Sequence, residues 1–224
     1  MSFFDTLQEA TQQERHELFN LPIIVDALQG KVSLDSYRAF LAQAYYHVRH
    51  TVPLMMACGA RLPTRLEWLR KAVAEYIEDE YGHEHWVLND IAACGGDRDA
   101  VRDGQPSLSI ELMVSFLYDL IARGNPVGLF GMVNVLEGTS IALATHAAGS
   151  IRERLALPET AFSYLSSHGS LDIEHMQTYR HLMNQLEDPQ DQAAVIHASK
   201  MVYRLYTEMF RGLPRHAEAQ DAAA

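Results

Sequence analysis

Residues 126–154 read PVGLFGMVNVLEGTSIALATHAAGSIRER, and the length and apolar spacing of this stretch predict one long helix. Between residues 124 and 151, histidine aside, Glu137 is the only acidic or basic residue. The helical row of Glu137 is otherwise apolar or small and holds Phe130, Val133, Ser140 and Ala144. We therefore expect this helix to lie in the core of a helical bundle and to carry one buried carboxylate.

Glu137 needs a partner inside such a core. Burying a lone carboxylate costs several kcal/mol or forces the group to take up a proton. The segment supplies no Lys or Arg, so the partner has to come from another helix or from a metal ion. This segment alone leaves two interpretations open, a metal ligand and a protonated or water-linked glutamate.

The rest of the chain is divided by Pro and Gly into segments of helical length, and no run alternates as a half-buried strand does. The expected helices cover about residues 3–19, 22–30, 63–95, 109–123, 126–154, 158–187 and 189–211, with Gly169 as a candidate break. A further long helix begins after Ser33, runs through Tyr45 and Tyr46, and is kinked at Pro53. We predict an all-α fold, a single bundle of about seven to eight helices over residues 1–213, with a loose tail over 214–224.

Composition limits the classes of function. The chain has 224 residues, 48% hydrophobic and 21% charged, as in a globular domain, and its net charge of −11 argues against nucleic-acid binding. No apolar run approaches the ~20 residues of a membrane span. The N-terminus turns polar within a few residues, and Cys58 and Cys94 cannot form a disulfide framework. We expect a cytoplasmic protein with reduced thiols.

A second apolar row follows Pro63 and contains two polar residues, Glu80 and His83. Steps of three or four residues connect Leu66, Leu69, Val73, Tyr76, Glu80, His83, Val87, Ile91 and Cys94. Glu80 and His83 form a Glu-x-x-His pair, by which helical bundles present two ligands to one metal. The alternative is a solvated charge cluster, because Glu78, Asp79, Glu84 and His85 surround the pair, and this segment alone favours that alternative.

A third row carries three more candidate ligands, His168, Asp172 and His175. The row continues at helical spacing into aliphatic and aromatic positions: Leu171, Tyr179, Leu182 and Leu186. A lone core histidine is usually only hydrogen-bonded, whereas two histidines and an aspartate on one apolar row favour a metal. Three imidazoles and three carboxylates exceed the four ligands of a structural zinc and suit a pair of iron or manganese ions.

The motif His168-x-x-x-Asp172-x-x-His175, with Tyr164-Leu165 before it and Glu137 about thirty residues upstream, resembles the haem-oxygenase-like di-iron oxidases and oxygenases. This group includes the CADD-like proteins and is related to the TenA and PqqC superfamily. The likeness runs from about residue 18 to 210 and includes the segment 43–48, QAYYHV. The resemblance implies that Glu80, His83, Glu137, His168, Asp172 and His175 hold two irons per chain, or manganese, and that the cluster activates O2 to oxidise an organic substrate.

Two choices stay open within this interpretation. Some members of the group have a wider Glu/His spacing, which Glu78 and His85 would fit, but Glu80 and His83 lie on the apolar row and are preferred. The alternatives to an oxidase are a TenA-like C–N hydrolase of the thiaminase type and a non-catalytic binding or regulatory protein. The expected partners are O2 and a small molecule (a fatty acid, an amino acid or an aromatic precursor), with a homodimer plausible and no membrane or nucleic acid.

Overall fold

The computed structural model describes residues 1–215, with the backbone alone for residues 168–174. No strand occurs within this part of the chain. The α-helices are α1 (Phe3–Ala10), α2 (Gln12–Phe19), α3 (Pro22–Leu28), α4 (Leu34–Val48), α5 (Thr51–Arg61), α6 (Glu67–Glu80), α7 (His83–Ala93), α8 (Arg98–Asp103), α9 (Leu108–Arg123), α10 (Phe130–Leu155), α11 (Ser163–Asn184) and α12 (Pro189–Arg211). Short 3-10 turns at Thr64–Leu66, Pro126–Leu129 and Glu159–Ala161 lead into α6, α10 and α11.

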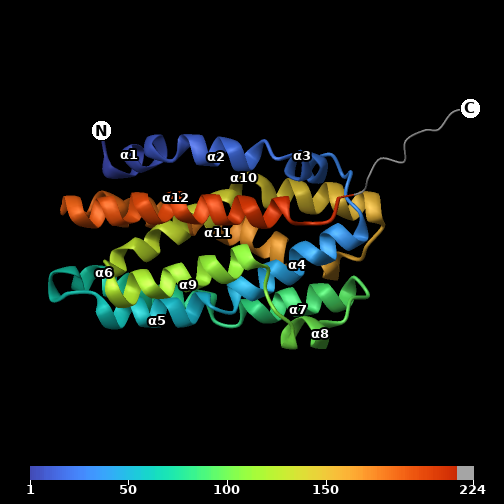
Figure 1. The fold of residues 1–224 in the computed structure, drawn as a ribbon, viewed down its shortest axis with the longest axis horizontal. Coiled ribbons are helices and arrows are strands. Elements are labelled where there is room, and N and C mark those ends of the chain that lie inside the picture. Colours follow the sequence, from blue (N-terminus) through green and yellow to red (C-terminus); the bar gives the residue numbers. More distant parts are fainter. Residues whose placement is uncertain (216–224) are drawn as a thin grey trace, which may run out of the picture.

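The longer helices run along the long axis of an elongated bundle (Figure 1). Helices α1, α2 and α3 follow one long edge, helices α5, α7 and α8 lie along the opposite edge, and α10, α11 and α12 lie between them. Helix α10 packs against α11, α12 and α3, while α7 packs against both α4 and α11. The all-helical single bundle expected from the sequence is confirmed for the described residues.

Helix α10 is the central helix of this arrangement. By length and hydropathy the stretch Pro126–Leu155 could also cross a membrane, with a mean hydropathy of 1.5 in its most apolar window. However, 67% of that window is buried inside the fold, which is the position of a core helix. Gly131 lets the backbones of α10 and α12 lie close together, because a Cβ at this position would be 2.6 Å from the backbone nitrogen of Ser199 in α12.

Several helices predicted as continuous are broken, so the bundle has more helices than the seven or eight expected. The first is interrupted at Thr11, and the one predicted to kink at Pro53 instead ends at Val48 and resumes at Thr51. Pro53 therefore lies in the first turn of α5, where a missing N–H is tolerated. The short helix α8 was not predicted, and α11 runs through Gly169 without a break.

The row from Leu66 to Cys94 was predicted to lie on one helix, and this is wrong. Helix α6 ends at Glu80, Tyr81 is extended, and Gly82 adopts a φ of +93°, a left-handed conformation that favours glycine. Helix α7 then begins at His83. The predicted burial is nevertheless correct, because every residue of that row is buried on both sides of the break.

Asp90 connects α7 to the start of α11. Its side chain is fully buried and accepts hydrogen bonds from the backbone N–H of Ser163 at 3.0 Å, from the backbone N–H of Tyr164 at 2.8 Å, and from the Ser163 hydroxyl. Burial raises the pKa of Asp90, and these hydrogen bonds act against that rise. The carboxylate thus satisfies orphan donors in the first turn of α11. Residues 216–224, most of the predicted tail, lie outside the described residues, so the domain boundary at 213 stays a prediction.

Replacing Asp90 by Ala should lower the free energy of unfolding by about 2 kcal/mol, because the change removes a cap and leaves buried donors without an acceptor. Urea denaturation followed by circular dichroism measures the effect. The matched control is Asp97→Ala, since Asp97 caps the exposed helix α8 and should cost only ~1 kcal/mol. Equal losses in the two variants would contradict the role assigned to Asp90.

Candidate metal centre

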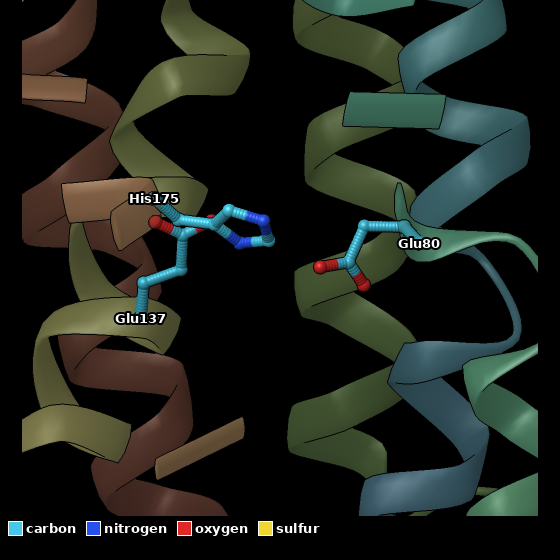
Figure 2. A group of neighbouring side chains, drawn as sticks. All are labelled: Glu80, Glu137 and His175. Carbon is cyan, nitrogen blue, oxygen red and sulfur yellow. The ribbon is translucent and has the colours of Figure 1, made fainter. Parts of the chain in front are cut away.

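Three side chains from three helices meet in the core of the bundle. Glu80 comes from the last position of α6, Glu137 from the middle of α10 and His175 from α11. Each offers one ligand atom, and these atoms all lie within 4.8 Å of one another. Figure 2 shows Glu137 and His175 side by side, with the Glu80 carboxylate facing them from the opposite side.

The imidazole of His175 lies between two carboxylates. Its Nδ1 is 3.7 Å from Oε1 of Glu137, and its Nε2 is 3.5 Å from Oδ2 of Asp79. The ring of Tyr76 packs against the imidazole, with 5.4 Å between ring centres. These neighbours fix the position of the ring and hold it beside acidic groups.

Glu80 has a second close neighbour in His83, across the break at Gly82. Nδ1 of His83 is 3.0 Å from Oε2 of Glu80, and both side chains are buried. Because a carboxylate only accepts, the imidazole N–H is the donor in this hydrogen bond. Trp86 stacks on the His83 ring with 3.9 Å between centres, so a ring contact as well as the hydrogen bond to Glu80 holds His83 in place.

The structure therefore brings together three of the predicted ligands, Glu80, Glu137 and His175, and puts His83 next to the first of them. The side chains of His168 and Asp172 lie outside the described residues. The alternative pair does not join the cluster, because Glu78 is exposed and the exposed His85 lies 3.7 Å from Glu84.

Two neighbours of the site were not predicted, Asp79 and His47. Asp79 was assigned to the solvated charge cluster, and its side chain is indeed 57% exposed although its carboxylate reaches His175. His47 is buried near the end of α4, and a histidine within the apolar and aromatic run 44–48 was the available signal. The identity of its neighbours depends on how α4 packs, which local sequence does not show.

A small cavity of about 60 Å³ adjoins the cluster. Its described lining residues are His47, Val48, Thr51, Met55, Glu80, Met132, Val133, Leu136, Glu137, Ser140 and Tyr164. This lining includes no Lys or Arg, and the sequence of residues 168–174 contains none either. Two acidic side chains thus share a largely apolar space without a cationic side chain in its described wall.

The charge of Glu137 acts on the hydroxyl of Tyr179. Burial raises the pKa of Tyr179 well above its usual value, and the charges of Glu137 and Tyr203 raise it further. The hydroxyl therefore stays protonated and donates a 2.8 Å hydrogen bond to the carbonyl of Phe130. This bond fixes α11 against α10, the two helices that supply His175 and Glu137.

The donor set suits a cation of the iron or manganese type. Carboxylate and imidazole ligands are typical of these ions in helical bundles, whereas soft metals and iron–sulfur clusters need thiolates. Neither Cys58 nor Cys94 is among the described residues that line the cavity. A bound divalent cation would also offset the charge of these two buried carboxylates, which lie beside the imidazoles of His83 and His175.

The fold is shared with solved structures of low sequence identity. A domain of unknown function with a haem oxygenase-like fold, from Shewanella denitrificans OS217, matches with a TM-score of 0.82 at 22% identity, over 95% of this chain and 92% of that one. A TenA homologue from Pseudomonas syringae pv. tomato DC3000 gives 0.79 at 13% identity over 93% and 91%. Haem oxygenase-1 from the cyanobacterium Synechocystis, in complex with haem, gives 0.73 at 14% identity over 94% and 91%. These likenesses confirm the haem oxygenase/TenA-like fold.

Sequence comparison identifies the protein family. No curated protein sequence matches this chain. Residues 38–207, however, match the profile of a family described as iron-containing redox enzymes. The matched range extends from α4 to α12 and includes all the predicted ligands. The chain belongs to this family of iron-containing redox enzymes.

Proposed function

We propose that this protein is a non-haem di-iron oxidase or oxygenase that uses O2 to oxidise a small organic substrate. The observation that carries the proposal is the buried cluster of Glu80, Glu137 and His175 in a chain of an iron-containing redox family. These ligand types are those of di-iron carboxylate proteins, in which helices direct glutamates and histidines into the bundle core.

The number of candidate ligands supports a site for two ions rather than one. The ligand atoms of Glu80, Glu137 and His175 lie within 4.8 Å of one another, close enough to hold one ion, and His83 stands beside Glu80 as a further donor. Helical spacing in the sequence assigns His168 and Asp172 to the row of His175, so the proposed set has six ligands. Six nitrogen and oxygen ligands exceed the four of a structural zinc and suit a pair of iron or manganese ions.

The chain's own residues have three tasks at such a site. Glu80, His83, Glu137 and His175 hold the metal, which supplies one-electron redox chemistry and O2 binding when present. Asp79, with its Oδ2 3.5 Å from Nε2 of His175, would help to orient the ring, as carboxylates beside ligand histidines do. The apolar wall, with Val133 and Leu136, keeps bulk water away from the reacting groups.

A TenA-like hydrolase is the weaker candidate, because neither cysteine of this chain is an activated thiol. The chain has two cysteines, and both are buried. Burial raises the pKa of Cys58 to about 12 and the pKa of Cys94 to about 11. A thiol nucleophile needs the opposite shift, since only the thiolate attacks.

Replacing Glu137 by Ala should remove at least one iron per chain and most of the activity. The metal-free variant should be about as stable as the metal-free parent protein, because the change removes the cost of burying a charge together with the contact to His175. Iron is measured after anaerobic reconstitution, and unfolding is followed by urea titration. The control is Glu111→Ala on the exposed face of α9, which should keep its iron. Full iron content in Glu137→Ala would contradict the ligand role.

The two neighbouring histidines provide a sharper comparison. His83→Ala should lose iron, because His83 is buried and bonded to Glu80, whereas His85→Ala should keep it, because His85 is exposed beside Glu84. Both variants are reconstituted anaerobically and assayed for iron per chain. The reverse pattern would move the ligand assignment to Glu78 and His85.

The redox role is tested with O2 itself. Protein loaded with two Fe(II) per chain should consume O2 faster than the same concentration of free Fe(II), as measured with an oxygen electrode. The Glu137→Ala variant under the same conditions should show only the rate of free iron. An iron-loaded parent protein that consumes O2 no faster than free iron would remove the basis for an oxidase.

A further inference from the structure

A second, larger cavity lies next to the metal centre and has an almost wholly apolar wall. Its volume is about 110 Å³. Its described lining residues include Leu136, Leu143, Ala147 and Ile151 of α10, with Phe40 of α4 and Phe210 of α12. No charged side chain or histidine is among the described residues that line it. A cavity of this kind excludes ionic groups and favours hydrocarbon.

The two cavities are neighbours. Leu136, Ser140 and Tyr164 line both of them. In addition, the ring of His47 in the small cavity packs edge-on against Tyr206 in the large one, with 5.7 Å between centres. A molecule that fills the large cavity therefore has one end against the residues that separate it from the small cavity, whose wall includes Glu80 and Glu137.

The shape of the large cavity distinguishes a chain from a ring. Along α10 its wall runs from Leu136 to Ile151, fifteen steps of ~1.5 Å each, or ~22 Å of helix. An apolar cavity of ~150 Å³ holds one benzene molecule, so a smaller volume spread over several helical turns is narrow. A narrow, elongated, apolar space fits an extended hydrocarbon chain better than a compact aromatic ring.

We propose that this cavity binds the unbranched alkyl tail of the substrate and directs the polar end toward Glu80 and Glu137. The proposal rests on the proposed function, because the metal centre defines which end reacts. The polar end enters a wall with no Lys or Arg among its described residues, so a substrate anion would find its countercharge at the metal. Among the classes considered from sequence, this favours an aliphatic amphiphile over an amino acid or an aromatic precursor.

Straight-chain primary alcohols of four to twelve carbons test the tail site on metal-free protein by isothermal titration calorimetry. Affinity should rise about fourfold per methylene, which corresponds to ~0.8 kcal/mol, until the cavity is full. Heptanol should bind more tightly than benzyl alcohol, which has the same number of carbons. Tighter binding of benzyl alcohol, or no dependence on chain length, would overturn the proposal.

Substitutions on α10 locate the site. Ala147→Phe should fill the cavity and reduce the affinity for octanol at least tenfold, while Ala142→Phe on the exposed face of the same helix should leave it unchanged. Leu143→Ala should enlarge the cavity and extend the series to longer chains. Equal binding by Ala147→Phe and Ala142→Phe would show that the alcohols bind elsewhere.

Iron content separates the failure of this proposal from the failure of the proposed function. Ala147→Phe keeps its iron if only the tail site is blocked. A parent protein that binds the alcohols but no iron would contradict the metal centre and leave the tail site standing.

Discussion

The apolar character of α10 is the constraint on which the rest of the structure depends. Histidine aside, this helix has one carboxylate and no basic residue between residues 124 and 151, so it is stable in water only when other helices enclose it, and α3, α11 and α12 do so. That enclosure puts Glu137 in the interior, where the free energy of its charge has to be offset by groups from other helices. The packing of α11 against α10 is therefore also the packing that brings His175 to Glu137.

Interactions outside the site set the relative positions of the helices that supply the donors. Asp90 of α7 caps the start of α11, and Tyr179 of α11 is hydrogen-bonded to the carbonyl of Phe130 at the start of α10. The bonds to Asp90 from Tyr164 and from Tyr179 to Phe130 are buried, so loss of either would leave an unsatisfied polar group. These bonds link three helices without using any of the site residues, so the site geometry has its own independent support.

The fold class was predictable because helical periodicity and Pro or Gly boundaries are local properties of the chain. The burial of Glu80, His83 and Glu137 followed from the same periodicity. The break at Gly82 escaped prediction because the apolar row keeps its phase across it, so both sides are buried with or without the break. His47 lies near Glu80 and Glu137 because of how helices distant in sequence cross. The apolar cavity arises in the same way, and no local sequence pattern encodes such crossings. The exposure of Asp79 matches its place in the charge cluster, but its contact with His175 was not predicted, because a carboxylate can be half exposed and still reach an imidazole of another helix.

The break at Gly82 also divides the proposed site between two helices. Glu80 ends one helix and His83 begins the next, so the two side chains belong to units whose internal hydrogen bonds are independent of each other. Tyr81, the residue after Glu80, is 77% exposed, so the chain reaches solvent between the two side chains. Opening of the chain at this break alone would separate Glu80 from His83 while both helices stayed folded. An ion held at the proposed centre would then exchange with solvent without global unfolding of the bundle.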